Sequence, residues 1–329
     1  MSPRGSLLLV EPYYGGSHRV WADGLAAHLS RPVAMLTLPA RWWKWRMRGA
    51  AATLAERCAD LDGVPAMVLA SDMLDVAAFR ALARPYLGDV PVGLYFHESQ
   101  LTYPDSPRAE PDLHYAFTNW QSALAADRVF FNSAYHREAF FAELPRLLRH
   151  FPDFTHEHLI GIVEAKSEVL HVGVDLGWAS EPIERSGPPR LVWNHRWEHD
   201  KDPEAFFAAV DVLADEGHDF EVVVCGENFS QDPVVFEQAA QRHPGRIVHM
   251  GYLPVDEYRA RLRESDVVVS TAHQEFFGIA VVEAVAAGCF PVLPSRLSYP
   301  ELIPSEWHDQ CLYPPGGLVA RLREVITRP

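Results

Sequence analysis

The sequence lacks any apolar run long enough to cross a membrane. No stretch of its 329 residues approaches the ~18 consecutive apolar residues that a spanning helix needs. The apolar run from Leu7 to Val10 is also too short for a signal peptide. The sequence therefore predicts a cytoplasmic protein that does not associate with membranes.

Cysteine is scarce as well. The four cysteines, Cys58, Cys225, Cys289 and Cys311, show neither the clustering of a disulfide framework nor the spacing of metal ligands. Two of them, Cys225 and Cys289, stand in apolar patterns that are typical of strands. We therefore expect buried free thiols.

Positive charge is limited. There are 29 lysines and arginines against 44 acidic residues, and the net charge is −15 at pH 7. A broad nucleic-acid footprint needs many cations on one face, so this composition leaves room only for a small basic patch. A hydrophobic content of 48% and the chain length indicate a globular protein with room for two domains.

Short apolar runs alternate with helical patterns along the chain, as in parallel sheets wrapped by helices. The stretch 172–188 is rich in Pro, Gly and charge and reads as a linker. The sequence predicts an α/β protein with two Rossmann-like, doubly wound domains, 1–175 and 176–329, facing a central cleft at the carboxyl ends of their strands. The expected strands are 6–10, 33–38, 66–69, 92–96 and 128–132, then 190–194, 220–225, 247–250, 266–270 and 289–293.

The segment 266–288 combines an apolar strand, a loop and a helix that Gly288 closes. Gly278 lies at the expected helix N-terminus, where free N–H groups and the helix dipole favour phosphate. Glu275 precedes it, and Glu283 lies roughly 7 Å along the helix at ~1.5 Å per residue. This spacing suits a nucleotide sugar, with Glu275 accepting hydrogen bonds from hexose hydroxyls and Glu283 from ribose hydroxyls.

A second motif follows the first strand of the second domain. Arg196 and Lys201 lie in a loop that leads into a helix, with Asp202 as the expected N-cap and Pro203 at the first helical position. Their cations can neutralise the charge that builds on a departing nucleoside diphosphate. With two cations and a helix terminus available for the phosphates, we expect no divalent metal and no other cofactor.

The N-terminal domain carries two further motifs at strand ends. Gly15, Gly16 and Ser17 open a helix after the first strand, where backbone N–H groups can face the donor, although an ordinary tight turn gives the same pattern. His97 and Gln100 follow the fourth strand. His97 is a candidate catalytic residue because it stands at the carboxyl end of a strand, the alternative being a structural histidine.

The segment 41–48 holds four cations and three tryptophans without an acid. Unpaired bases stack on indole and guanidinium planes while cations hold phosphates, so the segment is a candidate nucleic-acid contact. The alternative is a tryptophan cluster packed between the domains, with snorkelling arginines. The candidate acceptor-binding residues are Arg41, Trp42, Trp43, Lys44, Trp45, Arg46, Arg48 and Gln100.

These motifs carry a resemblance to known families. The Glu275 and Glu283 pair is similar to the two-glutamate signature of the retaining GT-B enzymes of glycosyltransferase family four, and Arg196 and Lys201 are similar to the cation pair of that family. The segments 14–18, 38–48, 95–104, 129–133 and 296–301 together resemble the tRNA-queuosine α-mannosyltransferase family, and they extend over almost the whole chain.

The resemblance implies transfer of mannose from GDP-mannose to the cyclopentenediol of queuosine in a tRNA anticodon, with retention at the anomeric carbon. It implies a GT-B fold, a nucleotide-sugar donor and a tRNA acceptor. By position, Glu275, Arg196, Lys201 and Glu283 would hold the donor. The residues expected to bind the donor are Gly15, Gly16, Ser17, Tyr252, Phe277, Gly278, Ile279 and Glu283.

Three other functions compete with this interpretation. A glycosyltransferase could act on a lipid or polysaccharide acceptor, although 41–48 is too aromatic and too short for a membrane-surface helix. A nucleotide-sugar epimerase can use the same architecture and releases a free sugar product. An RNA-binding module without catalysis is disfavoured because all four donor contacts are present.

Overall fold

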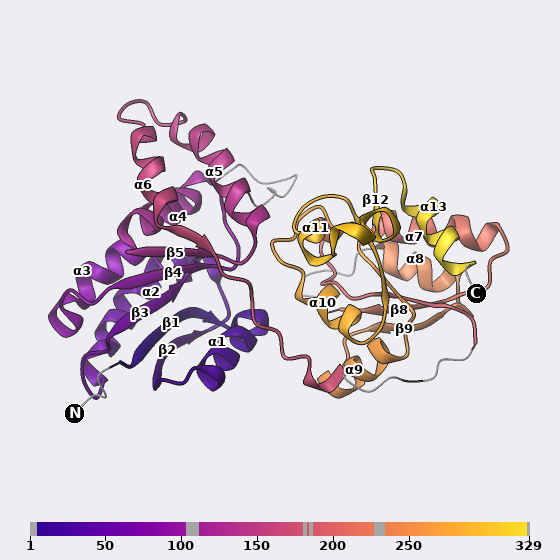
Figure 1. Ribbon diagram of the computed structural model, residues 1–329, viewed down its shortest axis with the longest axis horizontal. Coiled ribbons are helices and arrows are strands. Elements are labelled where there is room, and N and C mark those ends of the chain that lie inside the picture. The colour runs from indigo at the N-terminus through magenta and orange to yellow at the C-terminus, as the bar shows by residue number, and fades with distance from the viewer. Residues whose placement is uncertain (1–4, 103–111, 180–182, 184–186, 227–233, 328–329) are drawn as a thin grey trace. The chain divides into compact units, whose positions relative to one another are not determined.

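The computed structural model describes residues 5–102, 112–179, 183, 187–226 and 234–327. The chain divides into two compact units, Met1–Gly173 and Val174–Pro329, and each contains a six-stranded sheet (Figure 1). The predicted α/β class with two Rossmann-like domains is confirmed. Part of the predicted linker and the end of the 95–104 motif lie outside the described residues.

The first sheet is parallel throughout, with the strand order β2-β1-β3-β4-β5-β6. Its strands are almost entirely apolar because helices cover both faces, and Leu8, Val10, Leu94 and Phe96 belong to one core on one face. The elements are β1 (Leu7–Tyr14), α1 (Gly16–His28), β2 (Val33–Pro39), α2 (Trp43–Arg57), η1 (Cys58–Asp60), β3 (Met67–Ser71), α3 (Val76–Leu87), β4 (Val92–Phe96), α4 (Leu113–Ala125), β5 (Arg128–Phe131), α5 (Ala134–Leu148), η2 (Glu157–Leu159), α6 (Ile160–Ala165) and β6 (Ser167–Val169).

The second sheet is also parallel and has the order β12-β11-β10-β7-β8-β9. Alternate residues of one strand enter two different cores: Leu191 and Trp193 pack in one, and Val192 packs in the other. The elements are η3 (Gly177–Ala179), β7 (Arg190–Trp193), η4 (His199–Lys201), α7 (Pro203–Asp215), β8 (Glu221–Cys225), α8 (Val234–Arg242), β9 (Ile247–Gly251), α9 (Val255–Arg263), β10 (Val267–Val269), α10 (Ile279–Ala286), β11 (Phe290–Pro294), α11 (Tyr299–Leu302), η5 (Ser305–Trp307), α12 (His308–Cys311), β12 (Leu312–Tyr313) and α13 (Leu318–Ile326).

Strand order fixes where each unit can bind a ligand. Successive connections change direction between β1 and β3 in the first sheet, and between β7 and β10 in the second. At such a switch point the two loops leave the carboxyl edge on opposite sides and open a crevice within the unit. The residues that follow β1, β3, β7 and β10 are therefore the ones to inspect for chemistry.

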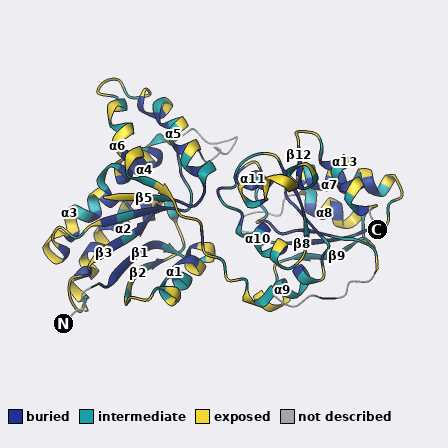
Figure 2. Ribbon diagram, viewed as in Figure 1, coloured by how far each residue is buried: buried dark blue, intermediate teal, exposed yellow. Residues whose placement is uncertain are grey.

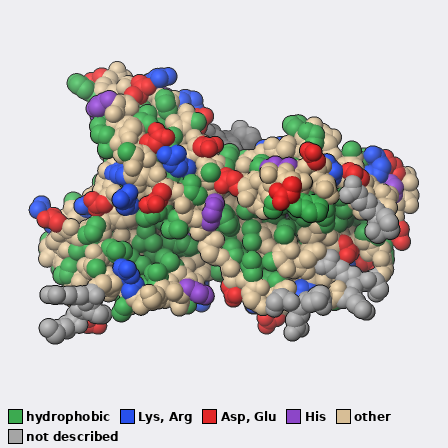
Figure 3. All heavy atoms as spheres, in the orientation of Figure 1, with side chains coloured by type: hydrophobic (Ala, Val, Ile, Leu, Met, Phe, Trp, Pro, Cys, Tyr) green, Lys and Arg blue, Asp and Glu red, His purple; other side chains and the backbone are tan. Residues whose placement is uncertain are grey.

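Burial and surface charge follow the pattern that the sequence composition indicates. Figure 2 shows the central strands of each sheet mostly buried, with exposed residues on the outer sides of helices and in loops. On the face drawn in Figure 3, acidic and basic side chains are interspersed over both units. All four cysteines are buried and free, as predicted. Within the described ranges, no helix has the length and apolar character needed to cross a membrane.

Candidate active site

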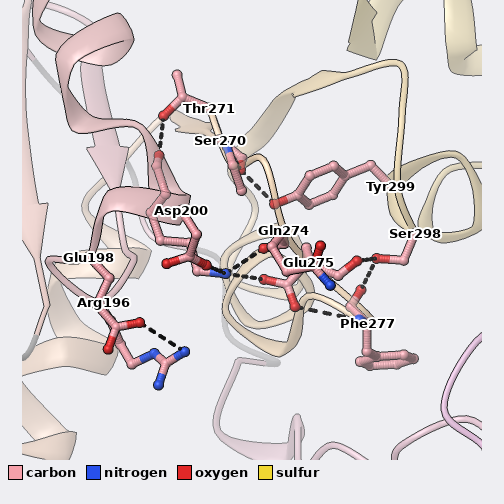
Figure 4. A network of polar contacts seen from close by, with 12 residues as sticks. Arg196, Glu198, Asp200, Ser270, Thr271, Gln274, Glu275, Phe277, Ser298 and Tyr299 are labelled. Atoms are coloured by element: carbon pink, nitrogen blue, oxygen red, sulfur yellow. Dashed lines mark hydrogen bonds and ion pairs between the residues drawn. The ribbon is translucent and has the colours of Figure 1, made fainter. Parts of the chain in front are cut away.

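The loop after β7 brings one predicted cation onto a predicted glutamate. Lys201 is 7% exposed, and its Nζ donates to the carbonyl oxygen of Gln274 at 2.6 Å. The same Nζ lies 3.2 Å from Asp200 Oδ2 and 3.5 Å from Glu275 Oε2 (Figure 4). The half-exposed Arg196 instead pairs with Glu198 at 3.1 Å. The structure thus joins Lys201 to Glu275 and leaves Arg196 at the surface of the loop.

Local capping explains the shape of this loop. Asp202 adopts φ +50° and its side chain accepts from the backbone N–H of Ala205 at 3.1 Å, with Pro203 at the start of α7. The predicted cap is therefore confirmed. The Thr271 hydroxyl donates to the carbonyl oxygen of Lys201 at 2.7 Å, and this bond ties the loop after β7 to the loop after β10.

The loop after β10 holds Glu275 at its polar end. One oxygen of Glu275 accepts from the Phe277 N–H at 3.4 Å, and Ser298 Oγ lies 3.3 Å from the Glu275 carbonyl oxygen. The guanidinium of Arg296 donates to the carbonyl oxygens of Thr271 and Ala272. These contacts fix the backbone while the Glu275 carboxylate remains partly accessible.

Helix α10 begins where the sequence predicts. Gly278 is its N-cap with φ +99°, a conformation that favours glycine. A Cβ there would also lie 3.1 Å from Leu302 Cδ1. The first turn has no capping side chain and no acid, so the positive end of the helix is available to an anion. Phe277 and Ile279 flank this N-cap.

Glu283 on α10 is held by a residue that the sequence did not reveal. The Tyr258 hydroxyl on α9 donates to Glu283 Oε2 at 3.0 Å and accepts from Asn194 Nδ2 at 3.0 Å. Asn194 also donates to the carbonyl oxygen of Ala280 at 2.8 Å. Burial raises the pKa of Glu283, against the lowering effect of this hydrogen bond. This series of hydrogen bonds, from Asn194 through Tyr258 to Glu283, therefore fixes the carboxylate in place.

A glycine at the end of β8 supports the loop that carries Arg196. A Cβ on Gly226 would lie 2.0 Å from the carbonyl oxygen of His195 and 2.8 Å from Trp197 Cδ1. His195 is buried, and burial lowers its pKa to about 3. No larger residue fits unless the loop moves.

We expect Gly226→Ala to destabilise the protein by about 2 kcal/mol, because overpacking against backbone has no flexible neighbour to absorb it. It should also lower activity by displacing Arg196. Urea unfolding monitored by circular dichroism measures the first effect. Gly245→Ala is the matched control, because a Cβ there meets no atom within 4 Å. Equal stability of the two variants would contradict the packing argument.

The first unit holds a buried charged cluster at its own switch point. Glu11 is fully buried within β1, and its Oε2 lies 3.1 Å from His18 Nδ1 on α1. Asp72, after β3, accepts from the backbone N–H of His97 at 2.8 Å. The rings of His18 and His97 lie 4.3 Å apart between centroids. Only His97 of these four residues was predicted from the sequence.

The cluster sets the charges of its members. Burial alone would lower the pKa of His18, but the charge and hydrogen bond of Glu11 raise it to about 9. Burial raises the pKa of Asp72 and lowers the pKa of His97. Across the described part of the chain, His97 Nε2 is buried and has no hydrogen-bond partner. It is therefore a neutral imidazole with one ring nitrogen uncommitted.

The ligand atoms of Glu11, His18 and His97 lie within 4.8 Å of one another. This spacing would also permit a metal ion. The buried hydrogen bond between Glu11 and His18 already satisfies two of the three groups without one.

We expect His18→Gln to reduce stability in a pH-dependent way. The folded pKa of His18 is raised above its ordinary value of 6.5 to about 9, so its contribution is fully present below pH about 6.5 and is lost as pH rises through about 9. The free energy of unfolding of the variant should fall short of the parent by about 3 kcal/mol near pH 6, and by much less near pH 10. Urea unfolding at both pH values measures this difference. A deficit that does not change with pH would contradict the charged pair.

The remaining residues predicted to bind the donor are Gly15, Gly16 and Ser17 in the first unit and Tyr252 in the second. Gly15 is the N-cap of α1, and a Cβ on it would lie 2.4 Å from Ala40 Cβ, so close packing alone requires a glycine. Gly16 has φ +51°, and Ser17 beside it is exposed. Tyr252 follows β9 and is exposed.

The predicted acceptor residues also divide. Gln100 is engaged within its own unit, since its side chain donates to Glu98 at 2.9 Å. Arg46 is buried and donates to the carbonyl oxygen of Pro39 at 3.1 and 3.0 Å. Trp42 and Trp45 are exposed. The segment 41–48 therefore has a buried side and a free side.

Comparison with known proteins gives this arrangement a context. Residues 6–174 match the family described as tRNA-queuosine alpha-mannosyltransferase N-terminal, and residues 179–328 match glycosyl transferases group 1. The chain is 35% identical over 312 residues to a tRNA-queuosine alpha-mannosyltransferase of Drosophila melanogaster, covering 91% of this chain and 82% of that protein. It is 29% identical over 178 residues to a glycogen synthase of Mycobacterium tuberculosis, covering 52% of this chain and 42% of that protein.

Solved structures resemble it over nearly its whole length. Sucrose-phosphate synthase from Thermosynechococcus elongatus aligns with a TM-score of 0.74 at 15% identity, covering 99% of this chain and 90% of the other. An E. coli trehalose-6-phosphate protein bound with UDP-2-fluoro glucose aligns with a TM-score of 0.69 at 14% identity, covering 99% and 92%. At these identities the likeness concerns the fold alone, and it confirms the predicted GT-B architecture.

Proposed function

This chain belongs to the tRNA-queuosine alpha-mannosyltransferase family, and from that premise we propose that it transfers mannose from GDP-mannose to the cyclopentenediol of queuosine in a tRNA anticodon, with retention at the anomeric carbon. The chain is a glycosyltransferase by both of its family matches. We further place it in the cytoplasm.

The single observation that carries the proposal is the pairing of Lys201 with Glu275 across the β7 and β10 switch point. A cation that neutralises phosphate and a carboxylate that orients sugar hydroxyls are needed side by side where a nucleotide sugar joins its two parts. Here they lie 3.5 Å apart beside the open terminus of α10. The anomeric carbon of the donor would lie beside this pair, where the diphosphate joins the sugar.

Each group then has a distinct role. Lys201, Arg196 and the N-terminus of α10 hold the diphosphate. Glu275 accepts hydrogen bonds from hexose hydroxyls, and Glu283 accepts them from the ribose while Tyr258 keeps it oriented. In the first unit, the neutral His97 stands beside Glu11 and His18 at the carboxyl end of β4, where the acceptor would approach.

The reaction proceeds on one face of the sugar. The bond between the anomeric carbon and the phosphate oxygen breaks, and GDP leaves with the electron pair. The acceptor hydroxyl oxygen bonds to the same carbon from the same side, and its proton passes to the departing phosphate oxygen. No enzyme nucleophile is needed, so the principal task of the protein is to stabilise charge on the leaving group.

A donor screen followed by product analysis tests the proposal. Thermal shift with GDP-, UDP- and ADP-sugars should single out GDP-mannose, and tRNA nucleosides digested after incubation should contain queuosine with one added hexose in the α configuration. Turnover of GDP-mannose without acceptor would instead indicate an epimerase. Transfer only to a lipid or polysaccharide would refute the tRNA acceptor.

We expect transfer to persist after removal of divalent metal. Protein dialysed against a chelator and assayed in its presence should retain its rate, because Lys201, Arg196 and the helix terminus supply the positive charge. The readout is the rate of hexose transfer before and after chelation. A loss that one metal ion restores would contradict metal independence, and Glu11, His18 and His97 would then be the first candidate ligands.

A further inference from the structure

The start of helix α2 in the first unit exposes two large aromatic side chains, one on the N-cap residue Trp42 and one on Trp45 in the first turn. Trp42 is 68% exposed and Trp45 is 63% exposed. Isolated exposed apolar residues need no explanation, but two indoles three residues apart at a helix start, beside three cations, form a patch of defined chemistry. The patch consists of Arg41, Trp42, Lys44, Trp45 and Arg48.

The patch stands on a rigid support. Trp43 faces inward and packs against Tyr115 of α4 with 5.1 Å between ring centroids, beside the buried Met47 and Met73. The guanidinium of Arg46 is held by its two hydrogen bonds to the carbonyl oxygen of Pro39. Trp43 and Arg46, both predicted as contacts, thus serve as the base that holds the patch.

Trp45 lies flat against its own helix. A Cβ on Gly49 would lie 2.8 Å from Trp45 Cζ2 and 2.9 Å from Cε2, so the indole ring rests on the glycine backbone. One ring face is therefore covered by the helix, and the ring remains 63% exposed. An indole held in this way presents a fixed flat surface and loses little freedom when another ring stacks on it.

The charge of the patch is positive. Arg41 lies over the Trp42 ring at 4.9 Å, Lys44 lies over Tyr115 at 5.8 Å, and Arg48 lies over Tyr115 at 5.2 Å. These contacts use the aromatic faces, and none of the three cations has an ion pair with an acid of the described residues. The first turn of α2 holds no acid. In a chain with a net charge of −15, this small region can still attract phosphate.

Exposed aromatic side chains beside cations that no acid of the described residues neutralises match unpaired nucleotides. Bases of a single strand or a loop can stack on indoles, whereas a duplex hides its base faces. The cations supply the phosphate contacts that hold such a strand. Through the cluster of Met47, Met73 and Tyr115, with Tyr13 packed against it, the patch adjoins the carboxyl edge of β1 and β3.

We propose that Trp42 and Trp45 are stacking platforms for unpaired nucleotides of the RNA acceptor, with Arg41, Lys44 and Arg48 neutralising the adjacent phosphates. The inference rests on the proposed function in that the RNA is the acceptor. It goes further by assigning recognition to the loop of the RNA rather than its stem. It also separates the contacting residues from the supporting ones.

The test compares Trp42→Ala/Trp45→Ala with the parent protein. The probes are a labelled anticodon stem–loop hairpin and a blunt duplex of the same length, with binding followed by fluorescence anisotropy. Hairpin affinity should fall about tenfold or more for each indole, and duplex affinity should change little. The KM for tRNA should rise while GDP-mannose binding stays unchanged. Trp307→Ala, which removes a 49% exposed tryptophan from the second unit, is the matched control.

Charge is tested separately. Lys44→Ala and Arg48→Ala should each weaken hairpin binding and reduce the slope of log affinity against log salt by about 0.7 to 1. Gly49→Ala should tilt the Trp45 ring and weaken hairpin binding without removing an aromatic group. Thermal unfolding of each variant verifies that the fold is intact.

The outcomes separate this inference from the proposed function. If the parent mannosylates tRNA and the double variant keeps the same KM and hairpin affinity, the stacking inference is overturned and the function stands. If the parent transfers nothing to tRNA, but hairpin affinity still falls in the double variant, the stacking contact with unpaired RNA stands and the proposed function fails. Equal loss of hairpin and duplex binding, or a change in self-association alone, would overturn the stacking role.

Discussion

Lys201→Met should lower the rate of hexose transfer by about 10²- to 10³-fold, equivalent to about 3–4 kcal/mol of transition-state stabilisation. Methionine keeps the length of the side chain and removes its charge. Lys201 contacts Glu275, which precedes the N-cap of α10 by three residues, and in the proposed mechanism it neutralises charge on the departing diphosphate. Because that charge develops during bond breaking, the loss should appear in kcat rather than in KM.

The substitution also leaves a buried carboxylate without its cation, so folding must be assessed with activity. Asp200 lies 3.2 Å from the Lys201 ammonium and is itself buried. Lys166→Met is the matched control, because Lys166 in the first unit donates to the carbonyl oxygens of Leu124 and Ala126. The control should lose stability but keep kcat. A folded Lys201→Met protein with parental kcat would remove Lys201 from the mechanism.

Local chemistry explains why much of the fold was predictable. The parallel strands are continuous apolar runs, because both faces of each sheet are covered, and the predicted and observed strands coincide within a few residues. Asp202 and Gly278 were identified as helix starts because capping depends on residues only a few positions apart. The loops that carry Lys201 and Glu275 could also be predicted, because each loop directly follows an apolar strand of the same sheet.

Short elements escaped prediction for the opposite reason. Helices α11 and α12 have four residues each, and β12 has two. Such lengths show no period, so nothing in the sequence distinguishes them from loops. The left-handed conformation of Trp42 at the start of α2 was also not predictable, because a tryptophan there violates the usual preference for glycine or asparagine.

The buried cluster of the first unit depended on tertiary contacts. Glu11 stands in an apolar strand and Asp72 beyond another, and only the pairing of β1 with β3 brings them to one edge. Tyr258 was missed similarly, since its position on α9 acquires meaning only from its bond to Glu283. In both units the motif residues could be predicted from the sequence, whereas the partners that set their charge and orientation could not.

Glu275→Gln should reduce hexose transfer by orders of magnitude, about 10²-fold or more, while the fold remains intact. Glutamine preserves the shape of the side chain and keeps one oxygen that can accept from the Phe277 N–H. It removes the negative charge beside Lys201, together with the second acceptor oxygen that the hexose hydroxyls would use. The free energy of unfolding should change little, because the Glu275 carboxylate is partly accessible and Ser298 and Arg296 hold the backbone of the loop.

The kinetic pattern of this variant distinguishes orientation from covalent catalysis. If Glu275 only orients the sugar, the variant should bind GDP-mannose nearly as well as the parent, and no glycosyl-enzyme should be seen by intact-protein mass analysis in either protein. If Glu275 were a nucleophile, the parent would accumulate a protein heavier by one hexose with a slow acceptor, and the variant would not. Glu306→Gln, an exposed glutamate in the second unit, is the matched control and should retain parental turnover. Parental turnover in Glu275→Gln itself would exclude this carboxylate from the site.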